Sequence, residues 1–213
     1  MNLIATDSAN PTAAAINAAV TALQNGEIIA YLTDTLYGLG GDARSTTAIE
    51  KIFSLKGRVT EKALPVIVGT KALAEKYAEE IPPVAAKLIE QFWPGPLTLI
   101  FRAAAHVPPE LIGGSGKIAM RLPATKLARE ISRTLGAPII ATSANRSGEP
   151  VLDSAQQIAE TFGERLALIL DSGPPLFSQP STIIDVTTLP PSLVRAGAVP
   201  MAEIKQRIGE LKT

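Results

Sequence analysis

The sequence contains no cysteine and a single histidine, and only 4% of its residues are aromatic. The absence of cysteine excludes disulfide bonds, thiolate catalysis and cysteine-ligated metal sites. One histidine cannot supply a typical zinc cluster, which needs several nitrogen or sulfur ligands. That histidine, His106, follows three alanines and precedes a Val-Pro-Pro turn. Nothing near it resembles a nucleophile elbow, so we expect it in a surface loop rather than in a Ser-His-Asp triad.

The chain also lacks long apolar runs and an excess of charge of either sign. No apolar run reaches the roughly 18 residues of a membrane-spanning helix, and residues 1–7 contain no basic region of the kind that opens a signal peptide. We therefore expect a cytoplasmic protein that does not bind a membrane. Twenty basic and twenty acidic residues give a formal net charge of zero. This balance argues against a surface devoted to nucleic acid, although a local basic patch stays possible.

The sequence does contain 46% hydrophobic residues in a length of 213, which suits one domain over residues 1–213. Asn10 and Pro11 have the pattern of a helix N-cap followed by proline in the first turn, and Ser45 can cap a second helix. Helices alternate with strands, which predicts the α/β class: an open twisted mixed sheet with flanking helices. A glycine-rich loop is expected over 33–44. The predicted helices cover 13–24, 46–55, 70–77, 82–92, 125–135, 154–162 and 200–211, and the predicted strands cover 27–32, 64–68, 96–101, 117–121, 137–141, 167–170, 182–186 and 193–195.

Three polar segments predict a ligand site. Residues 141–148, Ala-Thr-Ser-Ala-Asn-Arg-Ser-Gly, follow a predicted strand and present hydroxyls, an amide and a glycine instead of core side chains. Residues 33–40 follow another strand in the same way, and Lys56-Gly57-Arg58 with Lys62 follows a helix. Open α/β sheets bind ligands beyond the carboxyl ends of their strands. The three segments together indicate a site for an anionic, nucleotide-like ligand.

Several of these features also have a purely structural interpretation. The basic group could be a solvated cluster at the negative end of a helix dipole, or a clamp on phosphates. The glycines of residues 38–41 fit no nucleotide-binding fingerprint and favour a tight turn. Trp93, the only tryptophan, is expected to anchor a helix-to-strand turn in the core. Arg121 ends an apolar strand, where its bidentate fork could bind a carboxylate or form a structural ion pair.

Seven stretches, spread over residues 28–200, carry a resemblance to a known family. They are Tyr-Leu-Thr-Asp-Thr-Leu-Tyr-Gly-Leu (31–39), Lys-Gly-Arg (56–58), Trp-Pro-Gly-Pro-Leu-Thr (93–98), Met-Arg-Leu-Pro (120–123), Thr-Ser-Ala-Asn-Arg-Ser-Gly (142–148), Pro-Ser-Thr-Ile-Ile-Asp (180–185) and Arg-Ala-Gly (195–197). In this order they resemble the YrdC-like family, the threonylcarbamoyl-AMP synthases. The resemblance implies the single-domain YrdC-like fold in its short form, without the extra C-terminal domain of longer members.

The resemblance implies a nucleotidyltransferase, an L-threonylcarbamoyladenylate synthase, that makes threonylcarbamoyl-AMP and pyrophosphate from L-threonine, bicarbonate or CO2, and ATP. The product serves the N6-threonylcarbamoyladenosine (t6A) modification of tRNA, so the t6A transfer machinery is an implied partner, and direct tRNA binding stays open. Mg2+ is expected to be carried by ATP, with no metal site on the protein. The family pattern assigns catalysis to Lys56, Arg58, Ser143 and Asn145, threonine binding to Thr33, Pro65, Arg121, Ala141 and Ser181, and ATP binding to Lys56, Thr60, Lys117, Ser143, Val151 and Arg195.

Two other functions stay open from the sequence. The first is a binding module for double-stranded RNA or tRNA, without synthase activity, that uses the basic group as a phosphate track. Zero net charge and few aromatic residues count against it. The second is a paralogue that keeps the fold but has lost the synthase activity. The intact Lys56-Gly57-Arg58 and Ser143-Ala144-Asn145 stretches count against that function.

Overall fold

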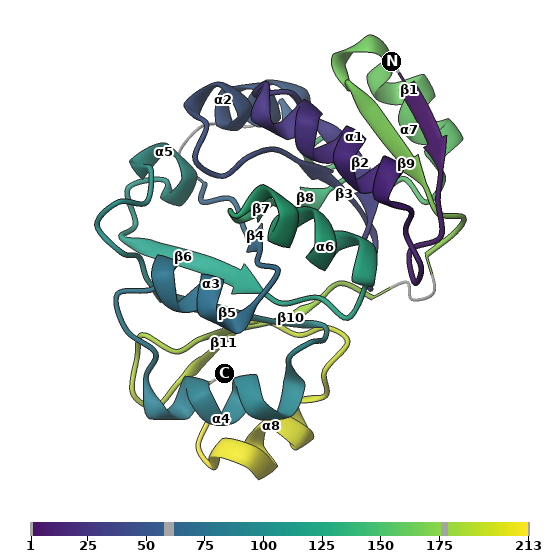
Figure 1. The fold of residues 1–213 in the computed structure, drawn as a ribbon. Coiled ribbons are helices and arrows are strands. Elements are labelled where there is room, and N and C mark those ends of the chain that lie inside the picture. The colour runs from purple at the N-terminus through teal and green to yellow at the C-terminus, as the bar shows by residue number, and fades with distance from the viewer. Residues whose placement is uncertain (1, 58–61, 176–178, 213) are drawn as a thin grey trace.

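The computed structural model describes residues 2–57, 62–175 and 179–212 of the chain. The strands form two sheets, with helices packed around them (Figure 1). The five-stranded sheet has the order β1 (Asn2–Ala5), β9 (Leu168–Asp171), β2 (Ile29–Leu32), β3 (Tyr37–Gly40) and β8 (Thr142–Ser143). The six-stranded sheet has the order β11 (Ser192–Arg195), β10 (Thr182–Asp185), β5 (Leu97–Arg102), β6 (Lys117–Arg121), β4 (Val66–Ile67) and β7 (Ile139–Ile140).

Both sheets mix parallel and antiparallel pairs. In the first, β9 pairs in parallel with β1 and β2, while β3 pairs antiparallel with β2 and β8. In the second, β10 is parallel to β5 and β4 is parallel to β6, and the other pairs are antiparallel. The central strand β2 is buried along its whole length, as its unbroken apolar sequence requires. The predicted α/β class with mixed strand pairing is confirmed, and the strands divide over two sheets.

Eight α-helices and one short 3-10 helix pack around the sheets in the described part of the chain. Ser45 caps α2 as predicted, because its hydroxyl accepts from the backbone N–H of Ala48. The predicted cap at Asn10 and Pro11 is wrong, since the hydroxyl of Thr12 accepts from the N–H of Ala15 instead. The helices are α1 (Ala13–Gln24), α2 (Thr46–Lys56), α3 (Lys71–Tyr77), α4 (Pro83–Phe92), α5 (Pro109–Ile112), α6 (Lys126–Leu135), α7 (Ala155–Phe162), the 3-10 helix η1 (Gly163–Arg165) and α8 (Met201–Ile208).

One extended segment joins the two sheets. Its first part, β7, pairs with β4 of the six-stranded sheet, and its second part, β8, pairs with β3 of the five-stranded sheet. Ala141 lies between the two parts, where its N–H donates to the carbonyl of Pro65 at 2.8 Å. The polar residues that follow Ala141 therefore lie at the edge of the five-stranded sheet, next to its junction with the six-stranded sheet.

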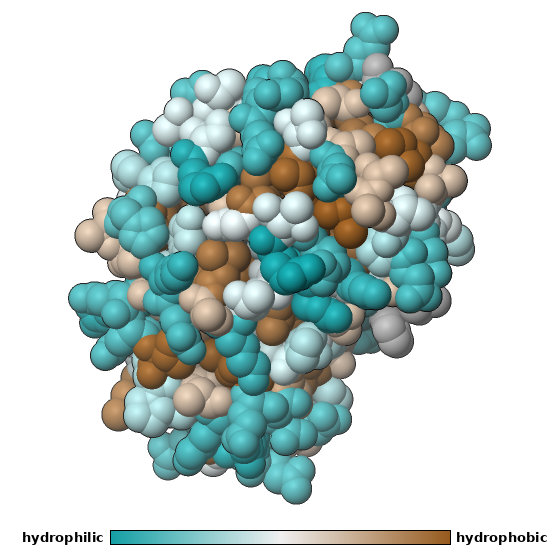
Figure 2. Space-filling view, in the orientation of Figure 1, coloured by the Kyte–Doolittle hydropathy of each residue, from teal (hydrophilic) through white to brown (hydrophobic). Residues whose placement is uncertain are grey.

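The larger apolar core contains residues of both sheets, including Leu39 of the first and Leu99 and Met120 of the second. A smaller core lies where α1 and α6 pack on the first sheet, around Tyr31 and Ile131. Figure 2 shows hydrophilic side chains over much of one face of the molecule, with apolar side chains gathered near β1 and β9. That residues 1–213 form a single domain stays a prediction.

The predicted glycine-rich loop over residues 33–44 is wrong in its centre, which forms strand β3. Its glycines do not mark a turn, because none of residues 38–41 has a positive φ. A Cβ added to Gly40 would lie 2.6 Å from the ring of Tyr31. Glycine is required here by the close approach of a large neighbour. Strand β1 and helix α5 were also absent from the sequence-based expectation.

Two predictions about single residues are confirmed. Trp93 is buried after α4, and its indole N–H donates to the carbonyl of Leu97 at 2.6 Å, so it anchors the turn into β5. His106 is exposed in the loop after β5, and its ring meets that of Tyr77 edge to face.

Candidate functional site

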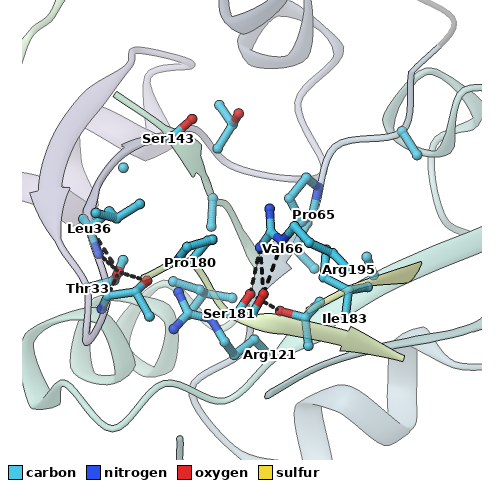
Figure 3. Close-up of a pocket in the computed structure, with 18 of the residues that line it drawn as sticks. Thr33, Leu36, Pro65, Val66, Arg121, Ser143, Pro180, Ser181, Ile183 and Arg195 are labelled. Carbon is cyan, nitrogen blue, oxygen red and sulfur yellow. Dashed lines mark hydrogen bonds between the residues drawn. The ribbon is translucent and has the colours of Figure 1, made fainter. Parts of the chain in front are cut away.

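A cavity of about 560 Å3 lies between the two sheets. The β2–β3 turn and β8 build one wall, and strands β5, β6, β10 and β11 build the other. In Figure 3, Thr33 lies on one side of the cavity, Ser143 at its upper end, and Ser181 and Arg195 on the opposite side. The cavity therefore collects side chains from segments that are far apart in the sequence.

Strand geometry explains which side chains of the six-stranded sheet line the cavity. Side chains alternate between the two faces of a strand, so Ala119 and Arg121 of β6 both face the cavity, as does Ile183 of β10. Lys117 precedes Ala119 by two residues and is on the same face. Its ammonium nitrogen pairs with Asp185 at 2.8 Å, and it does not line the cavity.

The upper end of the cavity is organised around Lys56, the last residue of α2. Its side chain is buried, and its Nζ donates to the carbonyl of Ser143 and to Oδ1 of Asn145, both at 2.7 Å. The Ser143 hydroxyl donates to the same Asn145 oxygen at 2.6 Å. Gly57 ends the helix with φ +58°, a conformation in which glycine is favoured. The solvated-cluster interpretation is wrong for Lys56, which is buried and hydrogen-bonded.

The turn between β2 and β3 forms around the hydroxyl of Thr33. This oxygen donates to the carbonyl of Leu36 at 2.7 Å and accepts from the N–H groups of Thr35 and Leu36, each at 3.2 Å. A threonine side chain that bonds nearby backbone groups in this way stabilises a turn. Thr33 and Thr35 are both buried and both line the cavity. The residue whose hydroxyl stabilises the turn thus also lines the cavity.

Arg121 lines the cavity and forms an ion pair with Asp34 through Nη1. The side chains of both residues are only 9% exposed. The second oxygen of Asp34 accepts from the backbone N–H of Ala124 at 3.1 Å. Arg121 therefore forms the structural ion pair that the sequence left open, and it also lines a cavity. Its binding of a carboxylate stays a prediction.

A second guanidinium lies close to the first. Arg195 donates to the carbonyl of Ser181 from Nε and Nη2, and to the Ser181 hydroxyl at 3.1 Å. The Ser181 hydroxyl also bonds that of Thr98 at 2.8 Å. Partial burial lowers the pKa of Arg195, and the nearby positive charge of Arg121 lowers it further. Two neighbouring cations at one cavity create a positive potential that suits an anionic ligand.

The structure brings most of the predicted site residues together. Those that line the cavity are Thr33, Lys56, Pro65, Arg121, Ala141, Ser143, Asn145, Ser181 and Arg195. Lys117 and Val151 do not line it, and Val151 is exposed. Arg58 and Thr60 lie outside the described residues. The roles assigned to all these residues stay predictions.

Sequence reasoning missed two residues at or beside the cavity. Thr98 lines it, and Asp34 holds Arg121 from outside the lining. Thr98 gives a weak signal, because it is a single hydroxyl in an otherwise apolar strand. The partner of Asp34 is 87 positions away, a distance over which a single sequence gives no signal.

The cavity offers no obvious protein site for a metal ion. None of its described lining residues is acidic, and no group of three or more His, Cys, Asp or Glu side chains is placed to hold a metal among residues 2–57, 62–175 and 179–212. Mg2+ prefers carboxylate and phosphate oxygens, and the expectation that Mg2+ is carried by ATP stays a prediction. No helix in the described part of the chain is both long and apolar enough to cross a membrane.

Comparison with known proteins places the chain in a family. Residues 21–197 match the Sua5–YciO–YrdC family, which is described as "Telomere recombination". The chain belongs to this family. The resemblance inferred from the seven sequence stretches is thereby confirmed.

Several relatives are threonylcarbamoyl-AMP synthases by name. The one from Pyrococcus abyssi is 38% identical over 190 residues, which cover 89% of this chain and 56% of that protein. The one from Thiobacillus denitrificans is 34% identical over 166 residues, which cover 78% of this chain and 88% of that protein. A crystal structure of P. abyssi Sua5 complexed with L-threonine matches all of this chain and 62% of that one, with a TM-score of 0.95 and 36% identity. The chain thus spans little more than half the length of the Pyrococcus relative.

Proposed function

We propose that the protein is an L-threonylcarbamoyladenylate synthase that acts on L-threonine, bicarbonate or CO2, and ATP in the cytoplasm, for the t6A modification of tRNA. One observation carries the proposal. A single cavity contains residues expected to bind threonine (Thr33, Arg121 and Ser181) together with residues expected to bind ATP or to act in catalysis (Lys56, Ser143, Asn145 and Arg195). The names of the relatives, and the threonine complex of P. abyssi Sua5, support the same reaction.

The reaction requires two bond-forming steps and no protein nucleophile. The threonine amine forms a bond to the carbon of CO2 and loses a proton, which gives a carbamate anion. A carbamate oxygen then attacks the α-phosphorus of ATP, and the bond from that phosphorus to the pyrophosphate oxygen breaks. Both steps depend on close positioning of anionic reactants and on neutralisation of their charge. A cavity with cations and hydroxyls, in a chain without cysteine, fits this requirement.

The geometry suggests a role for each end of the cavity. Arg121 would bind the threonine carboxylate, since a guanidinium offers two parallel N–H donors to it. Thr33 and Ser181, which lie on either side of Arg121 in Figure 3, would bind the other polar groups of the amino acid. Lys56 and Arg195 would neutralise phosphate oxygens, helped by Mg2+ that arrives with ATP.

The remaining assignments belong to the same proposal. Pro65 and Ala141 would contact threonine from the cavity wall. Lys117 would need to leave or share Asp185 to reach ATP. Val151 would need a closer approach of its loop, because it does not line the cavity.

The alternative of an RNA-binding module has less support. A phosphate track requires exposed basic side chains along a surface. Lys56 and Arg121 are instead buried at a cavity and already hydrogen-bonded to the protein. Direct contact with tRNA, and transfer to the t6A machinery, are further parts of the proposal that rest on the family alone.

The proposal is tested by pyrophosphate release from the purified protein with ATP and Mg2+. We expect release only when L-threonine and bicarbonate are both present, because the carbamate needs both. Omission of each substrate in turn is the matched control. ATP cleavage at the same rate without threonine would rule the proposed reaction out.

A further inference from the structure

Asp34 holds Arg121 from behind the cavity. Its carboxylate forms the ion pair with Nη1 of Arg121, yet Asp34 itself does not line the cavity. The second oxygen of Asp34 accepts from the backbone N–H of Ala124 at 3.1 Å. The carboxylate is thus fixed at both oxygens, by the segment after β6 and by Arg121 itself, and its side chain is 9% exposed.

The ion pair with Asp34 uses only the Nη1 group of the Arg121 guanidinium. Arginine has five N–H donors in a rigid plane. Among the residues that the structure describes, no hydrogen bond reaches Nε or Nη2 of Arg121. In Figure 3 the Arg121 side chain lies between Thr33 and Ser181. The Nε–Nη2 edge is therefore left available as a bidentate fork for a ligand carboxylate.

The positive charges at this part of the cavity require a carboxylate such as Asp34 beside Arg121. Arg121 is buried, and a buried cation without a partner is strongly destabilised. The positive charge of nearby Arg195 adds repulsion between the two guanidinium groups, and burial together with the charge of Arg121 lowers the pKa of Arg195. Without Asp34, Arg121 would lose its only compensating charge in the described structure and would turn toward other acceptors.

We propose that Asp34 is a positioning residue for the amino-acid substrate: it fixes the Arg121 guanidinium so that its Nε–Nη2 edge faces the substrate carboxylate. This inference rests on the proposed function, which supplies the carboxylate. It differs from two other roles for the same contact. If Asp34 competed with the substrate for Arg121, its removal would tighten threonine binding. If the ion pair were only structural, its removal would lower stability and leave threonine binding unchanged.

The test measures KM for threonine and for ATP in Asp34→Asn and Asp34→Ala by pyrophosphate release. Loss of a charge-assisted contact that orients the fork should raise the threonine KM about 10-fold or more. The ATP KM should change by less than about 3-fold, because none of the described residues proposed to bind the phosphates forms a hydrogen bond or ion pair with Asp34. Asp42→Asn is the matched control: Asp42 is a buried aspartate paired with an arginine, Arg44, away from the cavity. It should leave both KM values unchanged.

A double substitution shows whether Asp34 acts through Arg121. If it does, Arg121→Lys combined with Asp34→Asn should raise the threonine KM no more than Arg121→Lys alone. Multiplied effects of the two substitutions would overturn the inference, as would an unchanged or lowered threonine KM in both Asp34 variants that melt like wild type.

A measurement on the unaltered protein covers the case in which the Asp34 variants do not fold. The Arg121 side-chain N–H signals, assigned by their loss in Arg121→Lys, should show restricted guanidinium rotation before threonine is added. Free rotation without threonine would overturn the inference. Failure of the proposed function gives a different result, because the unaltered protein would then neither release pyrophosphate nor bind threonine by calorimetry.

Discussion

Replacement of Lys56 by methionine tests the proposed phosphate-binding end of the cavity most sharply. Methionine keeps most of the buried aliphatic length but removes the ammonium group, which donates to Ser143 and Asn145 at 2.7 Å. The Asn145 oxygen keeps one donor, the Ser143 hydroxyl. The Ser143 carbonyl also keeps one, the N–H of Asn145 at 2.9 Å. The lost free energy is therefore that of charge-assisted contacts to acceptors that stay partly satisfied.

Such a loss corresponds to about 1.5–3 kcal/mol of unfolding free energy. For a chain of this length, that should lower the melting temperature by about 3–12 °C. If the same ammonium also meets an ATP phosphate, ATP affinity should fall separately by about 10–150-fold. Lys56→Met should thus be both less stable and deficient in nucleotide binding.

The assay combines urea unfolding with calorimetric titration of ATP. Lys51→Met is the matched control on the same helix, because Lys51 pairs with Glu27 where both side chains are about 40% exposed. A surface pair of that kind contributes less than about 1 kcal/mol. Wild-type ATP affinity in a folded Lys56→Met variant would refute the assignment of Lys56 to the phosphates, and unchanged stability would refute the importance of its hydrogen bonds.

Three further predictions concern other parts of the molecule. Arg121→Lys keeps the charge but loses the fork, so threonine titrated at saturating ATP should bind more weakly while ATP affinity without threonine changes little; equal threonine affinity would contradict the assignment. Gly40→Ala places a Cβ 2.6 Å from the ring of Tyr31, and urea unfolding should show a loss of about 1–3 kcal/mol from overpacking. Burial alone would raise the pKa of Asp185, but hydrogen bonds from Lys117 and Thr187 outweigh it, so the pKa is lowered. Its charged form therefore stabilises the fold above a pH of about 4, and this stability is lost as the pH falls further; Lys117→Met should flatten that acid-side loss in urea unfolding measured from pH 6 to pH 3.

The sequence predicted those helices and strands that are determined by neighbouring residues. The helix after Ser45 and the strand over residues 117–121 follow from a side-chain cap and from an apolar run. Strand β1 has no such signal, because it is stabilised by parallel pairing with β9, more than 160 positions later. The reason for a glycine at position 40 could not be read from the sequence for a different reason. Glycine is favoured both where φ is positive and where a neighbour approaches closely, and only the position of the Tyr31 ring shows that Gly40 is the second case.

The sequence predicted which residues form the candidate site, but not the hydrogen bonds and ion pairs between them. Polar residues at strand ends, such as Thr33 and Ser143, gave the location of the cavity, since strand ends meet at one edge. The sequence could not show that Lys56 is buried between Ser143 and Asn145. Nor could it show the pairing of Arg121 with an aspartate from another strand end, because such contacts depend on the packing of the two sheets.

The central claim is that one cavity joins threonine, CO2 and the adenylyl group of ATP. The most direct test incubates the purified chain with ATP, Mg2+, L-threonine and 13C-labelled bicarbonate, and analyses the products by mass spectrometry. We expect a compound with the mass of threonylcarbamoyl-AMP that carries the label in its carbamoyl carbon. An unlabelled threonyl adenylate, or AMP without any adduct, would contradict the account.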